Sequence, residues 1–431
     1  MSSTLSVAPP TGHVNRRRGL VAASVGNALE WFDWNAYAIF AGFFAPRFFP
    51  PGNETTALLS TLAIFAVGFF FRPLGGALIA AFTDRKGRRA GLLLSVLFMA
   101  GGSLLIAVSP TYERIGLLAP ALLLLARVAQ GLSAGGEYAA SATYLAELAP
   151  SNRRGLYSSF LYLSVTVGTV AASLLATVLT GVLGKEAVAE WGWRIPFAIG
   201  ALLGVYGMYL RRALGETEAY VTGRNRRVPR PTVEVLRRHP FDALRVVGFT
   251  VGATTAYYTF AVYLPTYAQK AHGVSTSAAL WASVAAQLVM LVALPLLGIM
   301  SDRIGRRPLL IIFAAGYVLL VVPLFSLLGP SAWSLFAAMA IGLLLFSCYG
   351  AVAPTAMAEL FPTEVRTAGI GLPYALAVAA FGGTAPYIVE WLNSTGRDGW
   401  YPWYLATLCL ISLGVYLGTR ETRTTRLETI R

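Results

Sequence analysis

Charged side chains are scarce in this sequence. Only 13% of the 431 residues are Asp, Glu, Lys or Arg, whereas 56% are hydrophobic and the mean hydropathy is +0.62. A soluble domain carries about 25% charged residues, so this chain has too little polar surface for a water-soluble globule of its size. The deficit excludes a soluble enzyme and predicts a protein that lies within a membrane.

Cysteine and histidine are also rare. Cys348 and Cys409 both lie inside apolar runs without CxxC or metal-ligand spacing, which predicts packed thiols rather than a redox site. The three histidines, His13, His239 and His272, fall outside the apolar runs. We therefore expect no metal and no cofactor. The sequence also offers no Ser/His/Asp constellation, so we expect no enzyme.

Twelve long apolar runs account for most of the chain. Each can supply the roughly 20 apolar residues that a membrane-spanning helix needs, and a span must be helical to satisfy its backbone inside a bilayer. We expect an all-α membrane protein with twelve transmembrane helices. The runs occupy residues 19–46, 57–82, 90–109, 116–148, 156–183, 194–213, 245–269, 277–300, 308–328, 332–358, 367–392 and 400–419.

The net charge of +14 is distributed unevenly among the loops. Alternate loops hold most of the arginines, beginning with 16–18 before the first run, whereas the loops between them hold few. Lys and Arg accumulate on the cytoplasmic side of membrane proteins, so both termini are expected in the cytoplasm. Because this placement explains the basic charge as a topology signal, we expect no binding of nucleic acid.

Two motifs recur six runs apart. TDRKGRR at 83–89 follows the second run and SDRIGRR at 301–307 follows the eighth, while AELAP at 146–150 returns as AELFP at 358–362. Repeated halves are typical of transporters that bind their substrate midway across the membrane. The predicted parts are a cytoplasmic tail at 1–18, a six-helix bundle at 19–213, a cytoplasmic linker at 214–243, a second six-helix bundle at 244–419 and a cytoplasmic tail at 420–431.

The repeated turn resembles the signature loop of the major facilitator superfamily. In that family the loop acts as a cytoplasmic latch between helices, which implies a gating role here, while a plain basic loop with a turn glycine is the alternative. A glycine relieves the tight turn, and an aspartate can accept charge-assisted bonds from arginines. The predicted gating residues, including two acids that face the basic loops, are Asp84, Arg85, Gly87, Arg88, Glu147, Asp302, Arg303, Gly305, Arg306 and Glu359.

A second motif lies within the fourth run. Residues 127–131 read RVAQG, which is similar to the R-x-x-Q-G signature of the same superfamily, whose arginine is associated with proton coupling. A charged residue inside a membrane span is costly and is a functional candidate by default. We expect Arg127 to act in proton coupling or in the substrate network.

The chain is also similar to the metabolite:proton symporter branch of this superfamily, which carries carboxylates and osmolytes. The similarity includes GNALEWFD at 26–33, GFFFRPLGG at 68–76, QGLSAGGEY at 130–138 and WGWRIPF at 191–197. It implies the major facilitator fold, with two pseudo-symmetric six-helix bundles, in the inner membrane of a bacterium. The expected partners are a small organic anion, protons and the lipid bilayer, and we expect a monomer.

Two acids and one arginine reach the same depth in the first two spans. At about 1.5 Å per helical residue, Glu30 and Asp33 lie roughly 18 and 22 Å beyond the basic cluster that precedes the first run. Arg72 lies roughly 18 Å from the next basic loop by the same count. Half of the hydrocarbon layer is about 15 Å thick, so all three residues reach the midplane, where transporters bind their substrates.

These depths suggest distinct roles. We expect Glu30 and Asp33 to couple protons and Arg72 to bind a substrate carboxylate, because a guanidinium matches a carboxylate with two parallel bonds. A permanent ion-pair network within the first bundle is the alternative. Arg194, beside two tryptophans, is either a substrate ligand or an anchor at the outer interface.

The second half offers neutral polar groups rather than charges at this depth. Their hydroxyl and amide groups can hydrogen-bond a substrate from the opposite wall, although aromatic residues at helical spacing also serve as packing. The predicted substrate-binding residues are Arg72, Arg194, Tyr257, Tyr258, Gln287, Tyr349 and Tyr374.

The leading hypothesis is proton-coupled symport of a small carboxylate by alternating access, with α-ketoglutarate or a related dicarboxylate first. The alternatives are symport of a zwitterionic osmolyte such as betaine or proline, symport of a shikimate-like acid, and export of a small metabolite. Two cationic groups facing one cavity favour the dicarboxylate, and one favours the other substrates. A membrane receptor would need a signalling domain, for which the tails are short.

Overall fold

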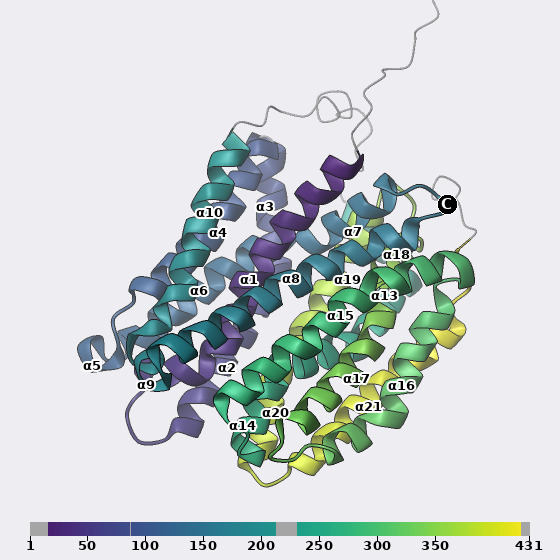
Figure 1. Ribbon diagram of the computed structural model, residues 1–431. Helices are drawn as coiled ribbons and strands as arrows, with labels where there is room; N and C mark the ends of the chain where they lie inside the picture. Colours follow the sequence, from purple (N-terminus) through teal and green to yellow (C-terminus); the bar gives the residue numbers. More distant parts are fainter. Residues whose placement is uncertain (1–15, 87, 213–230, 424–431) are drawn as a thin grey trace, which may run out of the picture.

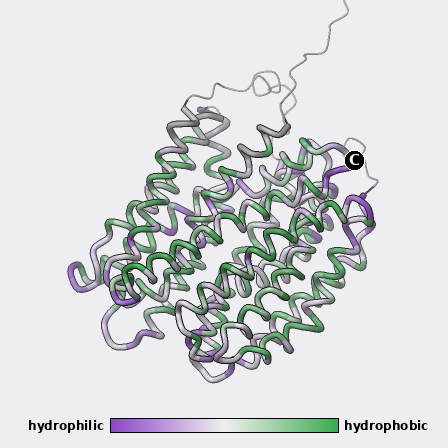
Figure 2. The backbone as a smooth tube through the Cα atoms, viewed as in Figure 1, coloured by the Kyte–Doolittle hydropathy of each residue, from purple (hydrophilic) through white to green (hydrophobic). Residues whose placement is uncertain are grey.

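The computed structural model describes residues 16–86, 88–212 and 231–423, and within these ranges every regular element is helical. The helices lie side by side in one bundle, with the first helix beginning and the last helix ending at the same end (Figure 1). Apolar residues cover the middles of the helices, and hydrophilic residues gather near their ends (Figure 2). This pattern is that of a bundle embedded in lipid.

The first half contains six passages, some of which are built from two consecutive helices. Its elements are α1 (Arg16–Phe48), α2 (Glu54–Phe70), α3 (Arg72–Lys86), α4 (Arg88–Val108), α5 (Tyr112–Ile115), α6 (Leu118–Ala134), α7 (Glu137–Leu148), α8 (Arg154–Leu183), α9 (Lys185–Ala187), η1 (Val188–Gly192) and α10 (Arg194–Arg212).

The second half also contains six passages, preceded by one short helix. Its elements are α12 (Pro231–Arg238), α13 (Pro240–Tyr257), η3 (Tyr258–Tyr263), α14 (Leu264–His272), α15 (Thr276–Ile304), α16 (Arg307–Ser326), α17 (Ala332–Gly350), α18 (Ala353–Ala358), α19 (Arg366–Ala377), η4 (Val378–Gly382), α20 (Ala385–Ser394), η5 (Asp398–Trp400) and α21 (Tyr401–Gly418).

Most of these passages are recognisable from length and hydropathy alone. Within the described residues, eight helical stretches are long and apolar enough to cross a membrane, and two shorter apolar helices accompany them. The remaining two passages are α1, which carries Asp33 and Asn35 in its middle, and the α13–α14 segment, which carries four tyrosines. The prediction of an all-α protein with twelve spans is confirmed.

Several passages break near the middle of the bundle. The second passage breaks between α2 and α3, where Pro73 follows Arg72, and proline lacks the N–H that would continue the helical bonds. The fourth passage breaks at Gly135 and Gly136 between α6 and α7. The second half has π-helical turns at η3 and η4. Irregular backbone at membrane depth is tolerated where it faces the protein interior, so these breaks point to an internal site.

The two halves meet along long helices. α8 packs along α1 in its own half and along α15 of the other half, and α2 contacts α20. The predicted linker at 214–243 falls largely on 213–230, outside the described residues. Beyond that gap, α12 forms a short helix, and α13 begins at Pro240. Residues 1–15 and 424–431 of the predicted tails are also outside the described part of the chain.

Glycines allow α6 to approach its neighbours closely. A Cβ atom added at Gly131 would lie 2.1 Å from the carbonyl oxygen of Gly68, and one added at Gly135 would lie 2.0 Å from the carbonyl oxygen of Arg72. Small residues permit such close backbone contact between membrane helices. The glycine of the R-x-x-Q-G motif therefore brings Arg127 of α6 next to α1 and α2.

We predict that Gly131→Ala lowers the thermal midpoint of the purified protein, because overpacking a close helix contact costs about 1–3 kcal/mol of unfolding free energy. Gly101→Ala is the matched control, since a Cβ atom at Gly101 meets nothing within 4 Å. Scanning fluorimetry in detergent measures both midpoints. Equal midpoints for the two variants would contradict the packing argument.

Candidate functional site

A buried polar network joins α1, α4 and α6. The Oδ1 atom of Asp33 accepts a hydrogen bond from the Ser103 hydroxyl at 2.5 Å, and its Oδ2 atom accepts one from Gln130 Nε2 at 2.6 Å. Gln130 Oε1 in turn accepts from Arg127 Nη1 at 2.7 Å. All four side chains are buried. Asp33 and Arg127 are thus linked through the Gln130 amide, which bonds both.

The indole ring of Trp34 contacts two guanidinium groups. The Cζ atoms of Arg72 and Arg127 each lie 4.0 Å from a ring centroid of Trp34. Both guanidinium groups therefore pack on the same indole side chain. Attraction between a cation and an aromatic face stabilises such a charge away from water. We call Trp34, Arg72 and Arg127 the two-arginine layer.

The two-arginine layer retains unused hydrogen-bond donors. The Nε and Nη2 atoms of both Arg72 and Arg127 are buried and have no hydrogen-bond partner in the described part of the chain. The buried hydroxyl of Tyr258, from the second half, also has none there, and its ring lies edge-on to Phe69, which stacks on Arg72. A buried cation without a paired anion is unfavourable. The arrangement is therefore suited to carboxylate groups.

The two predicted acids differ in their surroundings. Asp33 is 2% exposed and belongs to the network with Gln130 and Arg127. Glu30 lies one helical turn earlier on α1 and is half-buried. The sequence placed both acids at one depth, and the structure connects Asp33 through Gln130 to the arginine of the R-x-x-Q-G motif.

Two predicted residues of the second half bond across the boundary between the halves. The Tyr257 hydroxyl lies 2.9 Å from the Thr169 hydroxyl of α8, which also accepts from Asn35 on α1. Gln287 Nε2 on α15 lies 3.3 Å from Ser173 Oγ on α8. These bonds connect the two halves close to the central tyrosines.

Two further tyrosines lie in a central aromatic cluster. The ring of Tyr374 stacks on Tyr138 of the first half, with centroids 3.6 Å apart and planes at 2°. Tyr349 packs edge-on to Tyr162, and its buried hydroxyl has no hydrogen-bond partner among the described residues. The aromatic cluster joins the two halves, and its hydroxyl groups are polar groups at that contact.

Arg194 lies in a different setting. Its Nη2 atom donates to the carbonyl oxygen of Ser109 at 2.8 Å, and its guanidinium carbon lies 4.1 Å from the Trp193 ring centroid. These contacts tie the start of α10 to the end of α4. They agree better with an interface anchor than with a substrate ligand.

The predicted gating residue Asp302 connects the halves at the end of the bundle where α1 begins and α21 ends. Its carboxylate accepts from the backbone N–H groups of Gly155 at 2.8 Å and Leu156 at 3.0 Å, at the start of α8. A carboxylate is favoured at the N-terminus of a helix. Arg306 Nη1 donates to the same carboxylate at 3.1 Å and orients it.

Ion pairs reinforce this connection. Arg366 lies 2.7 Å from Glu147, and Arg154 lies 3.4 Å from Glu359, so each pair joins one half to the other. We call the contacts of Asp302, Glu147 and Glu359 across the halves the terminal-side latch. Burial raises the pKa of Glu359 above its ordinary value, although Arg306, the Thr422 hydroxyl and Arg154 oppose the shift.

The turn after α15 is closed by the C-terminal segment. Gly305 has a φ of +106°, which favours glycine. Glu421 accepts from the backbone N–H groups of Arg306 and Arg307, and Arg423 donates to the carbonyl oxygen of Arg303. In the first copy of the motif, Gly87 and the side chains of Asp84, Arg85 and Arg88 lie outside the described residues, so their gating role stays a prediction.

Some contacts of the site were not predicted. Trp34 directly follows Asp33 in the sequence. Nothing in the neighbouring residues indicated that its ring would contact two arginines. Ser103 is one small polar residue inside an apolar run. Glu390 is an acid inside the eleventh run, which was a usable signal, and it is 1% exposed.

Comparison with known proteins places these contacts in a family. The chain matches the Major Facilitator Superfamily over residues 23–386 and again over 270–429. It is 41% identical to the alpha-ketoglutarate permease of Escherichia coli strain K12, over 94% of this chain and 95% of that one. It is 33% identical to the citrate-proton symporter of Klebsiella pneumoniae, over 93% and 92% of the two chains.

A transporter of a different substrate is also similar. The chain is 32% identical to the proline/betaine transporter of Salmonella typhimurium, over 94% of this chain and 84% of that one. The crystal structure of a D-xylose-proton symporter superposes with a TM-score of 0.72 at 20% identity, over 94% and 98% of the two chains. The helical fold, the membrane spans and the sequence show that the chain belongs to the major facilitator superfamily, whose members are multi-pass membrane transporters rather than enzymes.

Proposed function

We propose that this protein is a proton-coupled symporter of a small dicarboxylate, with α-ketoglutarate as the first substrate to test, in the bacterial inner membrane. The observation that carries the proposal is the two-arginine layer, in which two buried guanidinium groups share Trp34 and retain free donors. One carboxylate would pair with Arg72 and the other with Arg127. The similarity to a permease of alpha-ketoglutarate supports the same substrate class.

Proton coupling follows from the bond chain between Arg127 and Asp33. Gln130 bonds both residues, so the positive charge of Arg127 stabilises the ionised form of Asp33. A substrate carboxylate that pairs with Arg127 weakens this influence, and a proton on Asp33 then becomes easier to hold. Substrate and proton therefore favour each other's binding, as reciprocal coupling between two sites requires. Mutual stabilisation of this kind drives symport.

Alternating access follows from the difference between the two ends. The arginine-rich loops suggest that the end with the termini is cytoplasmic, and the terminal-side latch closes the halves together there. At the opposite end, a cavity of about 230 Å³ lies between the halves. We propose that this arrangement is the outward-facing state, in which substrate arrives from outside while the cytoplasmic route is shut.

A zwitterionic osmolyte is the second candidate. Trp31, Trp34 and Phe69 surround Arg72, with ring centroids 5.6, 4.0 and 4.3 Å from its Cζ atom. Aromatic rings of this kind also attract quaternary ammonium groups, and a betaine would need only one guanidinium for its carboxylate. The similarity to a proline/betaine transporter agrees with this candidate.

We predict that purified protein in liposomes exchanges labelled α-ketoglutarate and that Arg72→Lys lowers the apparent affinity about tenfold, because it keeps the charge and loses the bidentate geometry. Arg194→Lys is the matched control, since its partners are Ser109 and Trp193. Counterflow and substrate-induced thermal stabilisation measure the two effects. Counterflow of betaine but not of α-ketoglutarate would support the osmolyte, and an unchanged affinity in Arg72→Lys would place Arg72 in a structural role.

We predict that Asp33→Asn abolishes accumulation driven by a pH gradient while substrate exchange continues, because exchange does not require release of the proton. Glu30→Gln is the comparison on the same helix. Uptake with an imposed gradient is measured beside exchange at equal pH. Normal gradient-driven accumulation in both variants would remove these acids from the coupling mechanism.

We predict that closure of the terminal-side latch depends on pH. The pKa of Glu359 is raised in the closed latch because the carboxyl is buried, and opening would hydrate it and return the pKa to its ordinary value. The closed state therefore binds the proton more tightly, so acidification stabilises closure and a rise in pH through the raised pKa removes that contribution.

This effect is measurable through Ser158, which is buried at the latch and accepts from the backbone N–H of Thr355 at 3.2 Å. A thiol reagent should label Ser158→Cys more slowly at about pH 5.5 than at about pH 7.5, relative to the same cysteine in a Glu359→Gln background. Identical pH profiles in the two backgrounds would show that Glu359 does not set the pH dependence of opening.

A further inference from the structure

Lysine is rare in this chain, and two of its three lysines lie around one cavity. The sequence contains 34 Lys and Arg residues, and only Lys86, Lys185 and Lys270 among them are lysines. Two of these three, Lys185 and Lys270, line the cavity between the halves at the end opposite the termini. Nearly all other basic residues of this chain are arginines. The presence of two lysines around one cavity therefore suggests that the chemistry of lysine matters there.

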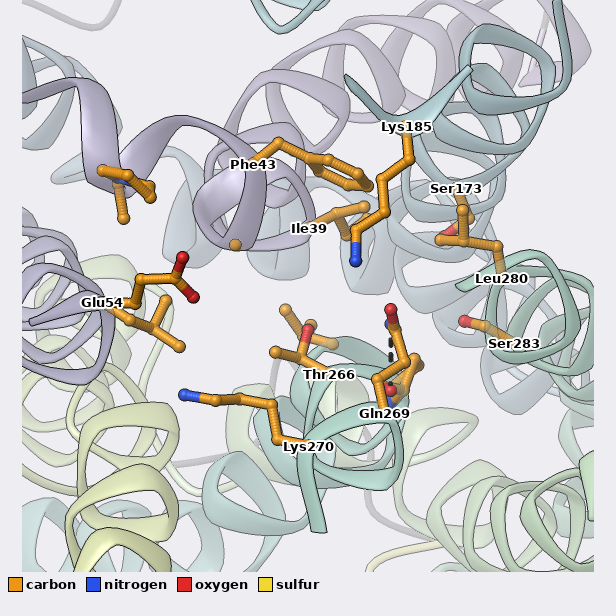
Figure 3. A pocket seen from close by; sticks show the side chains of 16 residues that line it. Ile39, Phe43, Glu54, Ser173, Lys185, Thr266, Gln269, Lys270, Leu280 and Ser283 are labelled. Atoms are coloured by element: carbon orange, nitrogen blue, oxygen red, sulfur yellow. Dashed lines mark hydrogen bonds between the residues drawn. The ribbon is translucent and has the colours of Figure 1, made fainter. Parts of the chain in front are cut away.

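The cavity is built by both halves. Lys185 stands on α9 of the first half and Lys270 on α14 of the second, and both reach into the space shown in Figure 3. Ser173 and Ser283 line its wall from opposite halves, and Gln287 lies within hydrogen-bond distance of both hydroxyls. The cavity has a volume of about 230 Å³. We call it the lysine vestibule.

The two lysines are not equally available. Lys270 pairs with Glu390, a buried acid that also accepts from the Tyr263 hydroxyl at 2.6 Å. Lys185 is exposed and forms no ion pair with any residue of the described chain. Glu54 lines another side of the same cavity. The positive charge offered to a ligand therefore comes mainly from Lys185, and Glu54 opposes it.

We propose that the lysine vestibule is a recruitment site for carboxylate anions, which Lys185 attracts before they pass to the two-arginine layer. This inference rests on the proposed function, since it names the step by which an anionic substrate reaches that layer. Charge focused at the mouth of a cleft raises the local concentration of an oppositely charged ligand and its rate of association.

The choice of lysine fits a transient site. An ammonium is a compact, strongly hydrated charge on a flexible stem, whereas a guanidinium binds carboxylates in a rigid two-pronged geometry. A recruitment site must release its ligand inward, so a weaker and more mobile cation is suited to it. The two-arginine layer, which lies among aromatic rings, has the geometry for firmer binding.

A charge-sensitive chemical probe tests the vestibule without depending on transport. Thr266 lines the cavity and is half-buried, and the native Cys348 and Cys409 are buried, so Thr266→Cys supplies a reporter thiol. The rate of its modification is measured with an anionic and with a cationic methanethiosulfonate reagent. Ser331→Cys is the matched control, because Ser331 is exposed in another loop at the same end.

The expected result is a higher anionic-to-cationic rate ratio at Thr266→Cys than at Ser331→Cys. Adding Lys185→Gln should slow the anionic reagent and speed up the cationic one by about threefold each, and so lower the ratio about tenfold, as expected for one unit charge about 6 Å away in watery surroundings. Lys185→Arg should preserve the ratio, and Glu54→Gln should raise it. Salt near 1 M should remove these differences, because the screening length falls to about 3 Å. A ratio that Lys185→Gln leaves unchanged at low salt would overturn the proposal.

Transport measurements distinguish a failure of this proposal from a failure of the proposed function. If α-ketoglutarate is a substrate, Lys185→Gln should raise the apparent KM for uptake about threefold at low salt, and high salt should abolish the difference. Uptake with an unchanged KM at low salt would overturn recruitment while leaving the dicarboxylate function in place. If α-ketoglutarate is not transported at all, the proposed function fails, and the reagent ratios still decide whether the vestibule attracts anions.

Discussion

Two arginine side chains in the interior of a membrane bundle are the constraint on which the rest of this protein depends. A buried cation is unfavourable unless other groups compensate its charge. Here Trp34 lies against both guanidinium groups, and Gln130 connects one of them to the carboxylate of Asp33. The close approach of α6 to α2, which Gly131 permits, brings these groups together. Packing, charge and the proposed substrate site are thus one arrangement.

The two ends of the molecule use charge in different ways. Where the termini lie, arginines and carboxylates from opposite halves pair directly, and Asp302 bonds the first N–H groups of α8. At the other end, Lys185 faces a cavity that remains between the halves. Ion pairs thus join the halves at one end, whereas Lys185, which forms no ion pair among the described residues, stands beside a cavity at the other.

The sequence predicted the membrane depth of several site residues, but it predicted few of the contacts between them. Counting residues from the basic loops put Asp33 and Arg72 at one depth, and both are buried in the structure. The bond from Ser103 to Asp33 joins residues 70 positions apart, and the bond from Gln130 joins residues 97 positions apart. Helical periodicity carries no information about such distant pairs. The stack of Tyr374 on Tyr138 and the ion pair of Lys270 with Glu390 are also contacts between residues far apart in the sequence.

The sequence by itself determined the membrane location, the helical class, the repeat of two halves and the family. The reason is that backbone groups in lipid must be satisfied within each span, so long apolar runs leave helices as the only solution. Only the tertiary structure decided which polar groups meet. It joined Arg72 and Arg127 through Trp34, linked Asp33 to Arg127 through Gln130, and closed one end of the halves while leaving a lysine-lined cavity at the other. Those contacts depend on the rotation and spacing of helices far apart in the chain, which packing of the whole bundle sets.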